Sequence, residues 1–261
     1  MRFASIGSGS GGNGMLIQQA DTCVLLDCGF SLKETEMRLA RLAIEPSQID
    51  AILVTHEHQD HASGVSRLAA KYQIPVLMTY GTMRAMQQQS IKQIESLLEE
   101  DLLNLIDSHQ GFEVADLFIQ PFPVPHDARE PVQFTISDGR AKLGVLTDTG
   151  SITPHILSSL KNCHGLWLEC NHDLDMLHQG AYPLSLKQRV GGRLGHLDNQ
   201  TSASLLAQIK HADLQFVVAA HISAQNNTPD LARQALSHAM GWQAEQILLA
   251  DQQAGLSWLN I

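Results

Sequence analysis

The sequence predicts an α+β fold in which sheets form layers and helices pack outside them. Three observations lead to this prediction. Apolar runs of strand length recur from end to end, segments with apolar residues at helical spacing lie between them, and the early strands follow each other closely whereas later ones alternate with helices. With 261 residues, 44% of them hydrophobic, the chain is long enough to bury a substantial core.

The expected elements follow from these patterns in chain order. Short apolar runs predict strands at residues 2–6, 15–20, 23–28, 51–55, 75–79, 117–124, 132–137, 141–148, 165–170, 216–221, 246–250 and 256–260. Helical spacing predicts helices at residues 32–43, 62–72, 81–100, 200–211 and 229–240. No low-complexity stretch or charge block marks a linker, and the second half echoes the first in outline. We therefore expect one domain over residues 1–261, built of two αβ halves of roughly 1–135 and 136–261.

Composition limits the function classes. The formal net charge of -10 argues against non-specific attraction to a nucleic acid or an anionic membrane, although it leaves room for a local basic groove. The four cysteines form no CxxC pair and are expected to be small buried residues in a reducing compartment. Because the N-terminus lacks a signal-like segment and no apolar run could span a bilayer, we expect a cytoplasmic protein without a membrane partner.

Several predicted strands end in polar residues of one chemical kind. These residues are Asp27, His56, His126, Asp148, Glu169 and His221. Strand ends that converge on one edge of a sheet form a site. The remaining histidines, at positions 109, 155, 164, 178, 211 and 238, have no such context and are interpreted as surface or structural residues.

The stretch "VTHEHQDHASG", residues 54–64, is the densest part of this pattern. Side chains two apart in an extended segment point the same way, so His56 and His58 could bind one metal ion together. Asp60 and His61 lie where a helix beginning near Ala62 takes over, and therefore face another direction. The stretch predicts half of the ligands for each of two ions.

Later strand ends supply the missing ligands. We expect His126 to join His56 and His58 at one ion, and His221 to join Asp60 and His61 at the second, with Asp148 bridging. Histidine and carboxylate ligands suit two divalent ions, Zn²⁺ first and Mn²⁺ as an alternative. Two ions roughly 3.5–4 Å apart would lower the pKa of a bridging water and hold the attacked group.

The order HxHxDH, His, Asp, His along nearly the whole chain resembles the metallo-β-lactamase superfamily. That resemblance implies an αββα four-layer sandwich with a dinuclear site at one sheet edge. Longer stretches, among them "LLDCGFSLKETEMRL", "GVLTDTGSIT", "LECNHDLDML" and "YPLSLKQRVGGRLGHLDN", are similar to its YycJ-like (WalJ-like) branch. Members of that branch are regarded as DNA-directed hydrolases, related in motif to ribonucleases Z and J. The sequence departs from the branch at Gly11, where Ser is commoner, and at Asp198, where Ser is commoner.

The resemblance implies ligand roles for seven residues: His56, His58, Asp60, His61, His126, Asp148 and His221. It implies catalytic roles for Asp60 and for a Glu169–His196 pair that donates a proton to the leaving oxygen; a structural role for His196 is the alternative. Asp27 is expected to orient a ligating histidine. His172 is either a phosphate or outer contact or a structural residue, and the loop of residues 7–13, with Ser8 and Asn13, either binds an anion or forms a plain turn.

A short basic segment offsets the acidic composition. Lys187, Arg189 and Arg193 precede His196, and no acidic residue lies between Asp175 and Asp198. These cations could hold a few phosphates with salt-sensitive affinity, although a solvated loop is the alternative. We therefore expect a 5′ exonuclease-like phosphodiesterase that acts on DNA rather than RNA through a metal-bridging hydroxide. A homo-oligomer or a repair partner is left open.

Two other functions remain open from the sequence. The same two-metal site could hydrolyse a small molecule such as a thioester, a lactone or a cyclic phosphodiester, because dinuclear sites also serve acyl transfer. Such an enzyme would not depend on Lys187, Arg189 and Arg193. A non-catalytic binding module is the third hypothesis, but such proteins usually lose ligands, and here all seven positions are filled.

Overall fold

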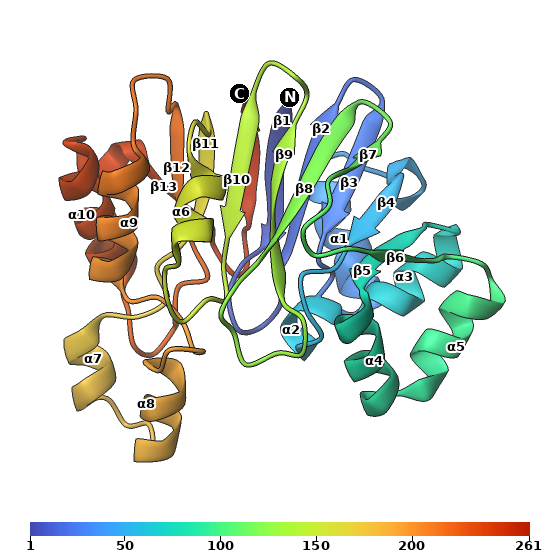
Figure 1. The fold of residues 1–261 in the computed structure, drawn as a ribbon, viewed down its shortest axis with the longest axis horizontal. Helices are drawn as coiled ribbons and strands as arrows, with labels where there is room; N and C mark the ends of the chain where they lie inside the picture. Colours follow the sequence, from blue (N-terminus) through green and yellow to red (C-terminus); the bar gives the residue numbers. More distant parts are fainter. The chain divides into compact units, whose positions relative to one another are not determined.

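The strands form two mixed sheets of seven strands each. The structure, a computed structural model, describes every residue from Met1 to Ile261 (Figure 1). The first sheet has the order β14-β1-β2-β3-β4-β5-β6, antiparallel from β14 to β3 and parallel from β3 to β6. Its strands are β1 (Arg2–Gly7), β2 (Gly14–Gln19), β3 (Thr22–Leu26), β4 (Ala51–Leu53), β5 (Val76–Thr79), β6 (Leu103–Ile106) and β14 (Leu256–Asn260).

The second sheet has the order β13-β12-β11-β10-β9-β8-β7. Its pairs β7–β8 and β9–β10 are antiparallel, whereas β10 to β13 run parallel. Its strands are β7 (Phe112–Val114), β8 (Leu117–Pro123), β9 (Val132–Ser137), β10 (Lys142–Leu146), β11 (Gly165–Glu169), β12 (Phe216–Ala220) and β13 (Ile247–Leu249).

The chain divides into two compact units. Unit 1 comprises Met1–Pro121, Ala128–Val132 and Asp251–Asn260, and unit 2 comprises Phe122–Asp127, Gln133–Ala250 and Ile261. Unit 1 carries α1 (Leu32–Arg41), α2 (Gln59–Ala62), α3 (Val65–Tyr72), α4 (Tyr80–Gln89), α5 (Ile91–Glu99) and the 3₁₀ turn Pro46–Gln48. Unit 2 carries α6 (Pro154–Leu160), α7 (Leu174–Gln179), α8 (Leu184–Val190), α9 (Asn199–Ile209), α10 (Pro229–Met240) and the 3₁₀ turn Ala244–Gln246.

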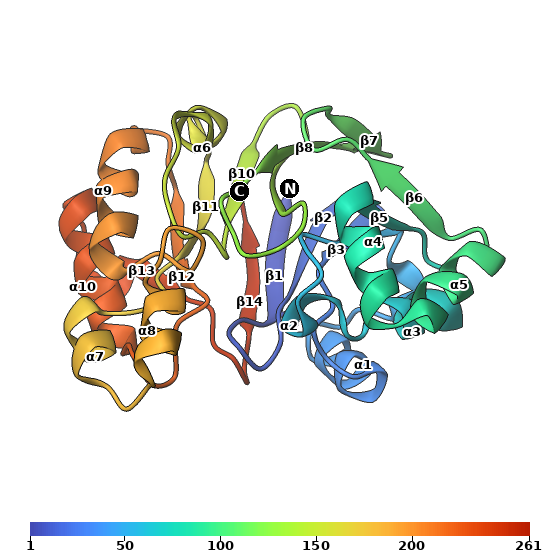
Figure 2. The same ribbon diagram turned by 60° about the horizontal axis from the view of Figure 1, so that its bottom comes forward.

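Each unit has its own hydrophobic core. In unit 1, strand residues such as Leu25 and Ile52 pack with helix residues such as Leu39 and Leu68. In unit 2, Leu168 and Val217 pack with residues of α9 and α10, and those two helices lie side by side along β12 and β13 (Figures 1 and 2). Both cores bury continuous apolar strand segments, as expected for parallel strands that are covered by helices.

All twelve predicted strands are present, but the structure adds elements that the patterns did not reveal. Strands β6 and β7 and helices α6, α7 and α8 were not predicted. The helix predicted over residues 81–100 is wrong as a single element, because Ser90 adopts an extended conformation (φ -156°, ψ 99°) between α4 and α5. The helix predicted over residues 62–72 is present as α3 and begins only at Val65. A separate short helix, α2, precedes it, so Asp60 and His61 lie within α2.

The cysteines are free and buried, as predicted. Burial is the main cause of raised thiol pKa values, to about 11 for Cys28 and about 11 for Cys163. Such thiols remain protonated at neutral pH and behave as small apolar core residues.

Candidate metal centre

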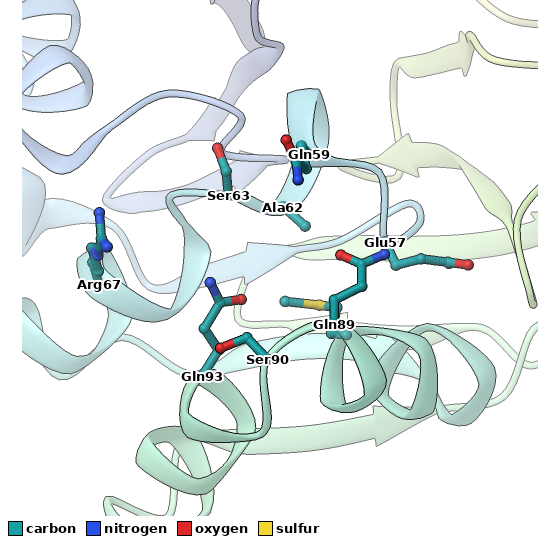
Figure 3. Close-up of a pocket in the computed structure, with 9 residues that line it drawn as sticks. Glu57, Gln59, Ala62, Ser63, Arg67, Gln89, Ser90 and Gln93 are labelled. Atoms are coloured by element: carbon teal, nitrogen blue, oxygen red, sulfur yellow. The ribbon is translucent and has the colours of Figure 1, made fainter.

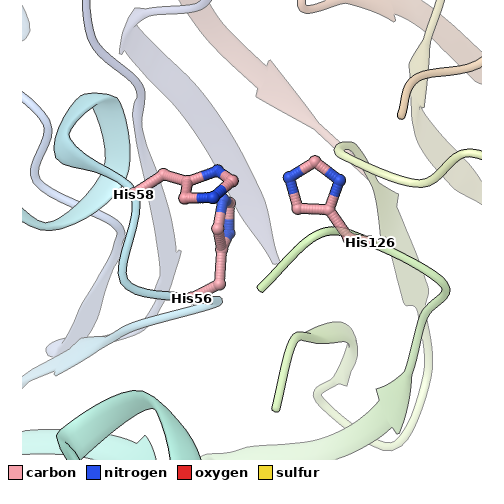
Figure 4. Close-up of side chains that lie close together, drawn as sticks. All are labelled: His56, His58 and His126. Carbon is pink, nitrogen blue, oxygen red and sulfur yellow. The ribbon is translucent and has the colours of Figure 1, made fainter. Parts of the chain in front are cut away.

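Unit 1 holds four of the seven predicted ligands on the segment that follows β4. The His56 ring lies with its centroid 4.5 Å from that of His58 and 4.3 Å from that of His61. His58 has an extended conformation as the N-cap of α2, and its carbonyl oxygen accepts the first backbone hydrogen bonds of that helix. The chain is thus extended up to His58 and helical from Gln59, and the ring of His56 lies close to the rings of both His58 and His61. Figure 4 shows the side chains of His56 and His58 on this segment.

A hydroxyl and a carboxylate behind the histidines orient two of the rings. Asp27 Oδ2 lies 2.8 Å from His61 Nδ1 and accepts a 2.9 Å hydrogen bond from the hydroxyl of Thr55. Thr55 Oγ1 in turn lies 2.9 Å from His56 Nδ1. With Nδ1 engaged by these partners, each ring turns its Nε2 atom away from them, which is the usual arrangement of metal-ligating histidines.

The glycine-rich loop of residues 7–13 contacts the same segment. The Asn13 amide nitrogen lies 3.0 Å from His61 Nε2, and its backbone N–H donates to the Asp60 carbonyl oxygen at 2.7 Å. The backbone N–H groups of Gly9 and Gly11 donate to Asn13 Oδ1 and Gln252 Oε1. Because these donors are used within the protein, the structure favours the turn over the anion-binding loop. Ser8 is buried at the start of this turn, and its N–H donates to the Asp251 carbonyl oxygen.

Unit 2 brings together four other predicted residues, three at strand ends and His196 between α8 and α9. Asp148, Glu169, His196 and His221 each offer a ligand atom, and these atoms lie within 4.8 Å of one another. Glu169 Oε1 lies 2.8 Å from His196 Nδ1 and 3.3 Å from His221 Nδ1. Its other oxygen accepts the backbone N–H groups of Thr149 and Leu197. Glu169 is thus held in place from both oxygens.

The electrostatics of this cluster follow from one carboxylate facing two imidazoles. Burial alone would raise the pKa of Glu169, but the charge and hydrogen bond of His196 outweigh it and hold that pKa well below its usual range. Burial would likewise lower the pKa of His196, but Glu169 outweighs burial and raises it. His196 therefore remains protonated at a higher pH than an ordinary histidine does.

Three candidate residues share a left-handed backbone conformation. Asp27 (φ 61°), Asp148 (φ 53°) and His221 (φ 53°) each directly or closely follow a strand. Asp, Asn and His are the side chains that tolerate this region best after glycine. Strained backbone of this kind concentrates at functional sites.

His126 follows β8 and is linked to the predicted basic segment within unit 2. Its Nδ1 atom lies 3.1 Å from the Gly195 carbonyl oxygen. Its neighbour Asp127 pairs with Arg189, whose Nε lies 2.6 Å from Asp127 Oδ2. Lys187 donates to the His178 carbonyl oxygen, and Arg193 is exposed. The cations belong to α8 and the turn after it rather than to an unstructured loop.

His172 is 1% exposed, and no hydrogen bond reaches its Nδ1 atom. Burial is the main cause of its lowered pKa, so the ring is neutral. The structure places it beside Asp198 through a backbone bridge. A direct contact with substrate would require movement of the surrounding chain.

Thr55 is the residue near the site that sequence reasoning missed. It lies directly before His56 in the motif, but an alternating pattern assigns it to the apolar strand rather than to the site. The available signal was a hydroxyl residue at the end of a fully apolar run, "AILVT".

Comparison with known proteins identifies the family. Residues 22–222 match the family model described as "Beta-lactamase superfamily domain". The chain belongs to that superfamily. It is 32% identical to "Exodeoxyribonuclease YycJ" of Bacillus anthracis over 92% of this chain and 89% of that protein. It is also 32% identical to "Exodeoxyribonuclease WalJ" of Streptococcus pneumoniae over 88% of this chain and 85% of that protein.

The superfamily fold is confirmed at the level of structure. The crystal structure of Zn²⁺-bound PqqB from Methylobacterium extorquens covers 100% of both chains with a TM-score of 0.77 at 19% identity. The predicted αββα sandwich and the resemblance to the YycJ/WalJ branch of the beta-lactamase superfamily are therefore correct. None of the helices has the length and apolar character needed to cross a membrane.

The donor chemistry fits the metal that the superfamily implies. Unit 1 offers imidazoles oriented by Thr55 and Asp27, and unit 2 offers buried carboxylates and imidazoles whose ligand atoms cluster. Nitrogen and carboxylate donors are the ones that Zn²⁺ prefers. The protein is a metal-dependent hydrolase of the beta-lactamase superfamily that binds divalent metal.

Proposed function

We propose that the protein is a dinuclear metal-dependent phosphodiesterase that degrades DNA as an exonuclease from the 5′ end. The observation that carries this proposal is the Glu169–His196 pair, with Oε1 and Nδ1 2.8 Å apart in a buried cluster. A proton donor held in this way serves a reaction with a poor leaving group such as a deoxyribose oxygen. The printed names of the YycJ and WalJ relatives, both exodeoxyribonucleases, support the choice of DNA.

Seven residues would hold the two ions in this proposal. His56, His58 and His126 would bind one, and Asp60, His61 and His221 the other, with Asp148 shared between them. Zn²⁺ suits these ligands, and Mn²⁺ is the alternative. Bound divalent ions would lower the pKa of a water molecule and neutralise charge on the phosphate.

The chain's own groups would do the rest of the chemistry. His196 would give its Nε2 proton to the leaving oxygen, while Glu169 holds Nδ1 and favours the protonated ring. Asp60 would accept a hydrogen bond from the attacking water. Thr55 and Asp27 would keep the ligating rings in one orientation, so that no reorganisation is required during the reaction.

Phosphate binding would fall to α8 and the turn that follows it. Arg189 is fixed by Asp127, the neighbour of His126, whereas Arg193 is exposed. Few cations and a net charge of -10 favour an enzyme that touches only a few nucleotides near a strand end. A hydrolase of thioesters, lactones or cyclic phosphodiesters is the second candidate, because its active site would need the same metal ligands.

The proposed function can be tested with metal-loaded protein and oligonucleotides labelled at either end. Single- and double-stranded DNA should be shortened from the 5′ end, with RNA and a thioester cleaved more slowly. His58→Ala should lose at least one equivalent of bound metal, measured by plasma emission spectrometry, together with its nuclease activity. His109→Ala, which changes an exposed histidine between β6 and β7, should lose neither. Turnover of acyl substrates without any DNA cleavage would favour the second candidate.

A further inference from the structure

Unit 1 contains a pocket of about 320 Å³ beside the metal-binding segment. The volume lies at the lower end of the range of small-molecule sites. Its lining comes from α2, α3 and the junction of α4 and α5: Glu57, Gln59, Ala62, Ser63, Arg67, Met86, Gln89, Ser90 and Gln93 (Figure 3).

The pocket and the predicted ligands share one segment of chain. Glu57 and Gln59, which line the pocket, alternate in sequence with His56, His58 and Asp60. A molecule in the pocket is therefore separated from the ligands of unit 1 by a single stretch of backbone. The pocket is therefore positioned to bind the part of a substrate that adjoins its reacting group.

The break between α4 and α5 shapes the floor of the pocket. The extended conformation of Ser90 ends α4 at Gln89 and starts α5 at Ile91. Figure 3 shows the side chains of Gln89 and Gln93, one from each helix, extending from this junction toward the α2 segment.

The lining has the chemistry of a nucleobase site. The amides of Gln59, Gln89 and Gln93 offer paired donors and acceptors, while Met86 and Ala62 offer apolar surface for a flat ring. An amide that reads adenine donates to N7 and accepts from N6. One oxygen of the buried Glu57 accepts the Arg129 N–H at 2.8 Å, and the other, Oε2, has no hydrogen-bond partner.

Other ligands fit this lining less well. An inorganic phosphate would meet one cation, the exposed Arg67, and the carboxylate of Glu57 would repel it. A fatty acyl chain would offer no hydrogen-bond partner to the three glutamine amides, at a cost in free energy for each one that it shields from water.

We propose that this pocket receives a nucleobase, best an adenine, of the nucleotide next to the phosphate that is cleaved, with Arg67 at its rim near the following phosphate. The proposal rests on the proposed function, since it names the part of a nucleic acid that the pocket recognises. Gln89 and Gln93 are the specificity-determining residues.

Binding provides a test that does not depend on catalysis. Deoxyadenosine 5′-monophosphate is titrated into the metal-loaded wild-type protein and into the Gln89→Ala and Gln93→Ala variants. Calorimetry and NMR of the glutamine side-chain amides measure the binding affinity. Each variant should weaken binding about tenfold, the lower end expected for loss of an amide–base pair. Gln88→Ala, an exposed neighbour on α4 outside the pocket, is the matched control. Equal affinity for deoxyribose 5-phosphate, which has no base, would overturn the proposal.

Cleavage provides the second test. Oligonucleotides with adenine or an abasic site at the terminal nucleotide are compared for wild type and Gln89→Ala. For wild type, kcat/KM should be about tenfold lower on the abasic substrate than on the adenine substrate, mainly through KM. For Gln89→Ala, kcat/KM should differ little between the two substrates. If Gln89→Ala lowered kcat/KM relative to wild type by the same factor on both substrates, the effect would be structural and would contradict recognition of the base by this pocket. If no DNA is cleaved but the mononucleotide binds through Gln89, the proposed function fails and the nucleobase pocket stands.

Discussion

Glu169 is a fully buried carboxylate whose pKa is nevertheless lowered, because His196 faces it at hydrogen-bond distance. An isolated carboxylate at this depth would take up a proton. The pair thus keeps opposite charges in the interior, and each partner sets the protonation state of the other. The stabilising effect of the Glu169 charge is present above its unfolded pKa and is lost only as pH falls through its lowered folded value.

The first residue-scale prediction concerns the pH profile of catalysis. Because Glu169 raises the pKa of His196, its proton is kept to a higher pH than in an ordinary histidine and is lost as pH rises through that folded value. His196→Gln should keep its metal and lower kcat by about 10²–10⁴-fold. Glu169→Gln removes the facing charge, so burial then lowers the pKa of His196 and the alkaline fall in kcat should move to lower pH. An unchanged alkaline limb in Glu169→Gln would contradict this role.

The second residue-scale prediction concerns Thr55. Its hydroxyl lies between Asp27 and His56, so Thr55→Val should remove the contact that orients the His56 ring at Nδ1. Loss of such an outer contact typically weakens metal binding about 10–100-fold. Competition with a chromogenic chelator would measure this, and Thr55→Ser, which restores the hydroxyl, should bind metal within about threefold of wild type. Equal affinity of the Val and Ser variants would exclude the role.

At the scale of elements, periodicity predicted the long helices and failed for the short ones. Helices α9 and α10 were predicted because their length reveals a repeated apolar face. Helices α7 and α8 span Leu174–Gln179 and Leu184–Val190, too few residues for a helical period, and Gly180 and Pro183 lie between them. The break at Ser90 is equally invisible, because residues 81–100 contain neither proline nor an internal glycine after Gly81. Both features arise from packing that local sequence does not encode.

Helix α8, which lies beside α7 (Figure 2), leads to a prediction about how DNA cleavage depends on salt concentration. If α8 and the following turn hold phosphates, log kcat/KM for DNA should fall linearly with log salt concentration. Arg193→Ala should weaken DNA cleavage and reduce the magnitude of that slope by about one. Arg140→Ala, an exposed cation in the turn between β9 and β10, should leave the slope unchanged. A slope near zero for wild type would contradict phosphate binding by this segment.

At the scale of the whole molecule, the chain has two cores. Leu25 in β3 and Leu206 in α9 are both completely buried, one in each core. Leu25→Ala and Leu206→Ala should each lower the free energy of unfolding by about 2–5 kcal/mol. Leu184→Ala, at a position 70% exposed, should change it by less than about 0.5 kcal/mol. Denaturant titration followed by circular dichroism measures all three, and a Leu206→Ala effect as small as that of Leu184→Ala would contradict the core assignment.

The sequence predicted the α+β class and the polar residues at strand ends because both depend on local patterns. Asp148, Glu169 and His221 could be selected because each follows an apolar run, and the structure brings them together. Single-domain organisation over residues 1–261 and the seven ligand roles remain predictions. The return of Asp251–Asn260 to unit 1 could not be foreseen, since pairing between residues more than 200 positions apart leaves no periodic signal.

That return has a consequence for how the protein is made. Strand β14 pairs with β1, with Arg2 opposite Asn260, so the first and last strands of this chain are neighbours in one sheet. During synthesis on a ribosome, β1 emerges early, but it cannot pair with β14 until residues 256–260 have been made. Unit 2, whose strands and helices lie within residues 122–250, has all of its elements before that last strand is made. The unit that begins first is therefore completed last, and until then β1 presents an unpaired strand edge that is prone to aggregation.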